Sequence, residues 1–166
     1  MKKFLLGIAV FLLAAEGSET AVAAEAGGGD IPRMVSIRSN RVNARSGPGA
    51  RYPIEWVYLQ KDTPVEIIAE FEVWRKVKDW QGSESWVHKS MLSGKRTVKV
   101  ITPGENNIYA KANYDSKVIA KAEDDVVGEV KKCQANNNFC LIKFNSIEGW
   151  VSKNNLFGIY PKEIIN

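Results

Sequence analysis

Nine residues in the middle of the chain return near its end. The sequence WVHKSMLSG, residues 86–94, reappears 64 positions later as WVSKNNLFG, residues 150–158, with Trp, Val, Lys, Leu and Gly in the same places. Two upstream segments match in the same order: VNAR at 42–45 with IYAK at 108–111, and WRKVK from Trp74 with FCLIK from Phe139. Solenoid repeats span roughly 20 to 50 residues, so each copy of this longer repeat is expected to fold around a small core of its own.

Within each copy, apolar residues recur at every second position in short runs that are separated by turn residues. One run places Val42 and Ala44 between polar neighbours, and a longer one covers residues 65–71. Alternation of this kind buries one face of a β-strand. No stretch after Met34 shows a convincing helical stripe. Roughly five or six short strands in about sixty residues predict a small, all-β barrel.

The beginning of the chain has the pattern of a secretory signal. Met1-Lys2-Lys3 is followed by the apolar run 4–15 and then by Ala21-Val22-Ala23, a small-residue cleavage pattern. The apolar run is too short for a bilayer, which requires roughly 20 residues. We therefore predict a signal peptide over residues 1–23 and a glycine-rich flexible tether over 24–33. The mature protein is expected in the periplasm or outside the cell, with no transmembrane anchor.

The balance of charges argues against nucleic acid as a partner. The net charge is +4, and it does not change when the predicted signal peptide is removed, because two lysines and two glutamates leave together. Lys and Arg alternate with Asp and Glu along the chain instead of forming a basic stripe. This small positive charge is compatible with an anionic wall polymer, and it is also typical of an ordinary soluble surface.

The segment VNARSGPGARYP, residues 42–53, contains two glycines around a proline and raises the question of a phosphate-binding loop. Such loops need glycines at other spacings and a helix whose first amides face the phosphate. Pro53 opposes the start of a helix, and Pro48 lacks an amide donor. The segment is therefore interpreted as a reversing loop, in which Gly47 and Gly49 supply backbone freedom.

Reactive side chains are few. Cys133 and Cys140 flank a predicted hairpin turn in the second copy, and in an exported protein they are expected to form a disulfide. Zinc sites need three or four protein ligands, and the candidate ligands here are these two thiols and the distant His88. His88 is replaced by Ser152 in the other copy, which argues against a catalytic base. We expect no metal, no cofactor and no enzymatic activity.

The order of these features resembles the bacterial SH3-like family. The first copy matches the family pattern most fully, in the segments RVNARSGPGARYPIEWVYLQKDTPVEII and WRKVKDWQGSESWVHKSML. In the second copy AKANYDSK stands where the Gly-Pro-Gly turn is expected. The resemblance implies two tandem SH3-like small β-barrels, one over residues 34–94 and a divergent one over 95–160.

The resemblance also implies a function. The protein is expected to be a non-catalytic exported module that binds cell-wall peptide (peptidoglycan) or an envelope protein. An interaction scaffold without wall binding is the alternative, and a small hydrolase would need a nucleophile that the sequence does not show. Some aromatic residues occur only in the first copy, where they either line an SH3-like groove or pack the two modules together. The predicted ligand-binding residues are Arg45, Tyr52, Trp56 and Trp80.

Overall fold

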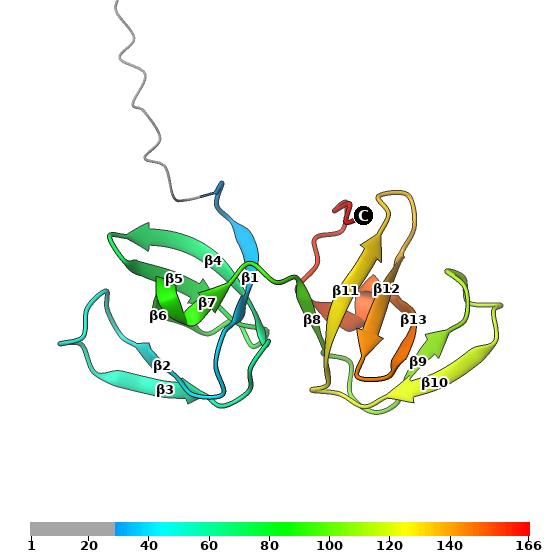
Figure 1. The fold of residues 1–166 in the computed structure, drawn as a ribbon, viewed down its shortest axis with the longest axis horizontal. Helices are drawn as coiled ribbons and strands as arrows, with labels where there is room; N and C mark the ends of the chain where they lie inside the picture. The colour runs from blue at the N-terminus through cyan, green and yellow to red at the C-terminus, as the bar shows by residue number, and fades with distance from the viewer. Residues whose placement is uncertain (1–28) are drawn as a thin grey trace, which may run out of the picture.

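The computed structural model describes residues 29–166. The predicted signal peptide, residues 1–23, and the first part of the predicted tether lie outside the described residues. The described part is all-β and forms two seven-stranded sheets, which stand side by side as two small barrels (Figure 1). The prediction of two tandem barrels is confirmed. Within residues 29–166, no helix has the length and apolar character needed to cross a membrane.

The two sheets have matching elements. The first contains β1 (Arg33–Ile37), β2 (Val42–Arg45), β3 (Ile54–Tyr58), β4 (Pro64–Phe71), β5 (Trp74–Lys78), β6 (Glu84–His88), the 3₁₀ helix η1 (Lys89–Met91) and β7 (Leu92–Ser93). The second contains β8 (Thr97–Val100), β9 (Asn106–Tyr109), β10 (Val118–Ala122), β11 (Val127–Cys133), β12 (Phe139–Phe144), β13 (Ile147–Ser152), the 3₁₀ helix η2 (Lys153–Asn155) and β14 (Leu156–Phe157).

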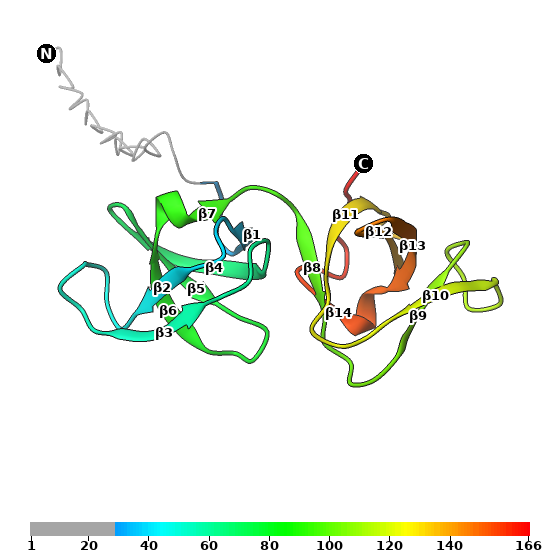
Figure 2. The ribbon, with the colours of Figure 1, turned by 60° about the horizontal axis from the view of Figure 1, so that its bottom comes forward.

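The strand orders are equivalent, β3-β2-β6-β5-β4-β1-β7 in the first domain and β10-β9-β13-β12-β11-β8-β14 in the second. Figure 2 shows each set of strands curling around its own centre. The pairing register corrects one sequence match. Arg45 pairs with Trp86, and Tyr109 pairs with Trp150, so VNAR corresponds to NNIY at 106–109 and not to IYAK. The pairing of each strand with the repeated tryptophan fixes this correspondence. The IYAK segment begins two residues after the true equivalent of VNAR.

Each barrel encloses a separate apolar core, because the alternating residues of its strands face inward. In β2, for example, Val42 and Ala44 are buried while Asn43 is exposed. The first core consists of Ile37, Val42, Ala44, Tyr58, Val65, Ile67, Val77, Val87 and Leu92. The second consists of Val98, Val100, Ile108, Ala122, Val130, Cys133, Cys140, Ile142, Phe144, Val151 and Leu156.

A disulfide joins Cys133 to Cys140, as predicted. The two residues are direct cross-strand partners in β11 and β12, their Cα atoms lie 4.5 Å apart, and both are fully buried. The end of the chain returns to the same place, since Ile165 and Cys133 exchange two backbone hydrogen bonds of 2.8 and 3.0 Å. The disulfide therefore lies under the returning C-terminal segment.

Replacing both cysteines with alanine is expected to lower the free energy of unfolding by about 2 to 3 kcal/mol, because the bridge closes a short loop in the unfolded chain. Urea unfolding of the oxidised protein and of the Cys133→Ala/Cys140→Ala variant measures the difference. The first domain contains no cysteine, so its spectroscopic signals serve as an internal reference. Equal unfolding midpoints for the two proteins would contradict this expectation.

Polar contacts join the two domains across the short connection between β7 and β8. The Thr97 hydroxyl donates to the backbone carbonyl of Asp62 at 2.7 Å. The Lys95 ammonium lies between the carboxylates of Asp62, at 3.0 Å, and Glu129, at 3.4 Å. In the C-terminal segment, the Tyr160 hydroxyl donates to Glu66 of β4 at 2.8 Å. The second domain is thus fastened to one side of the first.

The contact between Tyr160 and Glu66 predicts a dependence of stability on alkaline pH. Burial and the hydrogen bond to the Glu66 carboxylate raise the pKa of Tyr160 well above its ordinary value. The stabilisation is fully present below the ordinary tyrosine pKa of about 10 and is lost as the pH rises toward the raised value. Thermal melting between pH 8 and 12 should therefore show a smaller alkaline loss for Tyr160→Phe than for the wild type. Parallel profiles for the two proteins would refute the contact.

Candidate ligand-binding site

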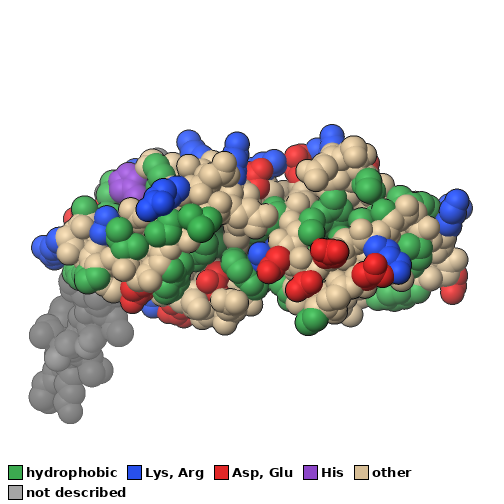
Figure 3. All heavy atoms as spheres, turned by 90° about the horizontal axis from the view of Figure 1, so that it is seen from below, with side chains coloured by type: hydrophobic (Ala, Val, Ile, Leu, Met, Phe, Trp, Pro, Cys, Tyr) green, Lys and Arg blue, Asp and Glu red, His purple; other side chains and the backbone are tan. Residues whose placement is uncertain are grey.

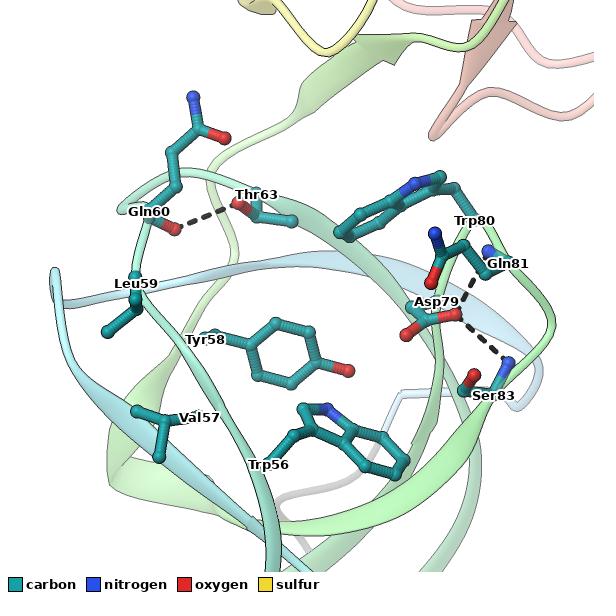
Figure 4. A pocket seen from close by; sticks show the side chains of 10 residues that line it. All are labelled: Trp56, Val57, Tyr58, Leu59, Gln60, Thr63, Asp79, Trp80, Gln81 and Ser83. Atoms are coloured by element: carbon teal, nitrogen blue, oxygen red, sulfur yellow. Dashed lines mark hydrogen bonds between the residues drawn. The ribbon is translucent and has the colours of Figure 1, made fainter.

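A half-open pocket of 440 Å³ lies in the first domain, between the end of β3 and the turn that joins β5 to β6 (Figure 4). Trp56 and Tyr58 enter it from β3. They are two residues apart on an extended strand, so both side chains point to the same face. Their rings meet edge to face, with centroids 6.4 Å apart. Leu59, which is 70% exposed, stands on the rim beside them.

The β5–β6 turn supplies the opposite wall. One carboxylate oxygen of Asp79, Oδ1, accepts the backbone amides of Gln81 and Ser83, each at 3.0 Å. Gly82 completes the turn with φ of +82°, a conformation that favours glycine. This closed turn holds Trp80 at the side of the pocket facing Tyr58 (Figure 4).

Polar atoms without partners lie beneath the surface of the pocket. The indole Nε1 of Trp56, the hydroxyl of Tyr58 and the hydroxyl of Ser85 are buried near one another, and none has a partner in well-formed hydrogen-bond geometry within the described part of the chain. Burial raises the pKa of Tyr58, and the nearby Asp79 carboxylate adds to the shift against opposing effects of Trp56 and Ser85. The phenol therefore stays protonated at neutral pH. Each unpartnered buried group costs about 1 to 3 kcal/mol, and none of the three atoms is exposed to the open space of the pocket.

The four predicted binding residues fall into two separate places. Trp56 and Trp80 both line the pocket. Arg45 and Tyr52 lie together in the loop between β2 and β3, where the Arg45 guanidinium donates to the Tyr52 carbonyl at 2.7 Å. Neither of them lines the pocket. Arg45 instead contributes to a smaller hollow of 190 Å³ beside His88.

The glycine-rich loop has a different explanation from the one expected. Neither Gly47 nor Gly49 has a positive φ, so backbone freedom is not what the loop requires. A Cβ atom on Gly47 would lie 2.4 Å from the ring of Tyr52, and one on Gly49 would lie 3.3 Å from it. The glycines make room for the Tyr52 ring, which folds back over the loop.

Trp80 also contacts the second domain. The ammonium of Lys99, from β8, lies 4.0 Å from the centroid of a Trp80 ring. Lys99 is almost fully buried and pairs with Asp125 at 2.9 Å. Both interpretations of the first-copy aromatics thus apply to Trp80, which lines the pocket and packs the two domains together.

The second domain has no equivalent aromatic pocket at these positions. Ala120 occupies the register position of Trp56, and Ala122 that of Tyr58. The strand pairing places Phe144 where the first domain has Asp79, and the Phe144 ring is buried in the second core. The cavity of the first domain is therefore filled by the core in the second.

Sequence reasoning missed Asp79 as a site residue. In a segment such as Asp-Trp-Gln-Gly, the local pattern indicates only that an aspartate can hydrogen-bond the backbone of a turn. Its burial and its place in the pocket wall depend on how β5 and β6 are docked against β3. Only the folded arrangement reveals them.

Other reactive groups do not form a second site. Residues 29–166 contain no cluster of three or more His, Cys, Asp or Glu side chains that could hold a metal ion. His88 Nδ1 is hydrogen-bonded to the Ser90 hydroxyl at 2.7 Å, and its ring meets Trp74 edge to face at 5.4 Å. Figure 3 shows one face of the molecule, on which basic, acidic and hydrophobic side chains are interspersed and no basic stripe runs across both domains.

The match to a protein-family model agrees with this architecture. The family model described as bacterial SH3 domain matches residues 38–94 and again 102–158. Among solved structures, NlpC2 from Trichomonas vaginalis is similar with a TM-score of 0.34 and 18% identity over 78% of this chain and 49% of that one. NlpC1 from the same organism gives 0.33 and 15% over 78% and 47%. The chain thus spans about half the length of these structures.

No curated protein matches the sequence. The family match covers both barrels and most of the described chain, and the matched segments begin 64 residues apart, at 38 and 102, the same offset as the repeated tryptophans. The chain belongs to the bacterial SH3 domain family, of which it contains two tandem copies.

Proposed function

We propose that the protein is a non-catalytic, exported binding module whose first domain holds cell-wall peptide in the pocket between Trp56 and Trp80. The observation that carries this proposal is an open aromatic pocket in one copy of a repeat whose other copy has alanines and a core phenylalanine in its place. Bacterial SH3 domains are typically cell-wall binding modules. A pocket of 440 Å³ has the size of an ordinary small-ligand site, large enough for one or two groups of an extended peptide.

Two features support the non-catalytic and exported parts of the proposal. Both cysteines of the chain are joined in the disulfide, so neither is available as a thiolate nucleophile. Disulfides form and persist in oxidising compartments, which favours the periplasm or the exterior of the cell. The second domain acts as a support, because Lys99 holds Trp80 and the C-terminal segment holds β4.

Co-sedimentation with purified peptidoglycan sacculi tests the proposal. The protein is expected to pellet with the sacculi in a saturable manner and to remain in the supernatant without them. A protein that stays in the supernatant at every sacculus concentration would overturn wall binding and favour a scaffold that holds an envelope protein.

A further inference from the structure

Asp79 is a buried carboxylate without a matching cation. Its residue is 6% exposed, and it forms no salt bridge with any side chain in residues 29–166. Oδ1 accepts the two turn amides, whereas Oδ2 accepts no hydrogen bond from the described residues. Figure 4 shows this second oxygen directed toward the interior of the pocket, on the side of Tyr58. Oδ2 is not among the fully buried unpartnered atoms, so it is open to the pocket, and a carboxylate with so little exposure is usually paired with a cation.

The walls around Asp79 suit a cation. Trp56, Tyr58 and Trp80 contribute aromatic rings to the same pocket, and the faces of such rings attract ammonium and guanidinium groups. The protein already places one ammonium in this way, that of Lys99 at 4.0 Å from Trp80. That ammonium is paired with Asp125, so it leaves the Asp79 charge uncompensated.

We propose that the pocket selects its ligand by a free amino group, which enters between Trp56 and Trp80 as a primary ammonium and pairs with the open oxygen of Asp79. This proposal rests on the proposed function, because it names the chemical group by which a wall peptide is held. A ligand whose amine is acylated loses the charge and the donors that Asp79 requires. An anionic group is repelled by the same carboxylate.

The second domain provides an internal comparison. At the position of Asp79 it has Phe144, a core residue, and at the two β3 positions it has Ala120 and Ala122. These three positions therefore provide no carboxylate, and the rings of Trp56 and Tyr58 have no counterpart. Recognition of an amine by this mechanism is therefore confined to the first domain.

Two small probes that differ only in whether the side-chain nitrogen is acetylated test the proposal. Nα-acetyl-lysine amide carries a free primary amine, and Nα,Nε-diacetyl-lysine amide does not. The indole N–H signals of Trp56 and Trp80 in ¹⁵N-labelled full-length protein are expected to shift with the first probe and to stay in place with the second. Equal shifts with both probes, or none with either, would overturn the proposal.

A variant assigns the effect to Asp79. Asp79→Asn retains a side-chain oxygen for the Gln81 and Ser83 amides but removes the charge, and we expect it to weaken binding of the free-amine probe at least tenfold. Glu55→Gln is the matched control, since Glu55 is exposed on the same β3 strand and does not line the pocket. Equal affinities of wild type and Asp79→Asn would contradict the assignment. Should Asp79→Asn fail to fold, the probe pair on the wild-type protein still decides the question.

Binding to untreated and to acetylated sacculi distinguishes a failure of this proposal from a failure of the proposed function. Acetylating the free amines of purified sacculi is expected to reduce binding of the protein at least tenfold. Undiminished binding to acetylated sacculi would leave wall binding standing and overturn amine selection. Absence of binding to untreated sacculi, together with shifts caused by the free-amine probe, would overturn wall binding and leave amine selection standing.

Discussion

Replacing Trp56 with alanine is expected to weaken binding to peptidoglycan sacculi by about 30-fold or more. The side chain forms one wall of the pocket and contacts Tyr58. Buried aromatic anchors at binding sites cost about 2 kcal/mol or more on truncation, and 2 kcal/mol corresponds to a factor of about 30 in the dissociation constant. Sedimentation at increasing sacculus concentration measures the change.

Two controls separate a lost contact from a lost fold. Trp74→Ala removes another half-buried tryptophan of the same domain, one that contacts His88 and does not line the pocket. We expect it to retain wild-type binding. Trp56 also packs on the first core, so thermal melting must accompany the measurement. Leu59→Ala, which changes a largely exposed side chain on the rim, should weaken binding without altering the melting temperature.

If Trp74→Ala weakens binding as much as Trp56→Ala, the pocket is not the binding site. The same conclusion follows if Trp56→Ala and Leu59→Ala, both folded, bind sacculi like the wild type. Either result would redirect attention to the surface around His88 and Arg45.

Gly158→Ala is expected to lower the free energy of unfolding by about 2 to 4 kcal/mol. Gly158 has φ of +112°, which is strained for any residue with a Cβ atom. The added Cβ would lie 2.4 Å from the carbonyl oxygen of Thr97 and 3.1 Å from Pro64 of the first domain. The close neighbours are mainly backbone, which cannot move away without disturbing β8 and the contact between the domains.

Gly94 is the matched control, because it holds the same place in the first copy of the repeat. It is exposed, and a Cβ atom there would meet nothing within 4 Å. Gly94→Ala should therefore change the free energy of unfolding by no more than about 0.5 kcal/mol, as is usual for surface substitutions. Urea unfolding measures the free energy of unfolding of both variants. Equal decreases for the two variants would contradict the packing described for Gly158.

The contrast between these glycines shows what the sequence can and cannot predict. The repeat, the alternating strands and the pairing of Cys133 with Cys140 follow from local patterns that hold in any context, and the structure has all three. The two repeat glycines look identical in the sequence. They differ in the structure because only Gly158 faces the other domain, and contacts between distant segments leave no local pattern.

The candidate site illustrates the same limit. The excess of aromatic residues in the first copy indicated either a groove or packing between the domains, and Trp56 and Trp80 line one pocket. Tyr52 belongs to the same excess, yet its ring folds over Gly47 within its own loop. Nothing in the local sequence pattern indicates a role for Asp79 in a site, because its burial in the pocket wall depends on the docking of the β5–β6 turn against β3. The sequence left open whether these aromatics line a groove or pack the domains together, and tertiary packing determines which of them line the pocket.

Hydrogen–deuterium exchange of the full-length protein, with and without soluble peptide fragments released from sacculi, tests the central claim most directly. We predict slower exchange on binding in residues 54–60 and 79–83, which form the two walls of the pocket, and unchanged exchange in the equivalent strand 118–122 of the second domain. Unchanged exchange in both walls at saturating peptide, or protection confined to the second domain, would contradict the assignment of wall-peptide binding to this pocket.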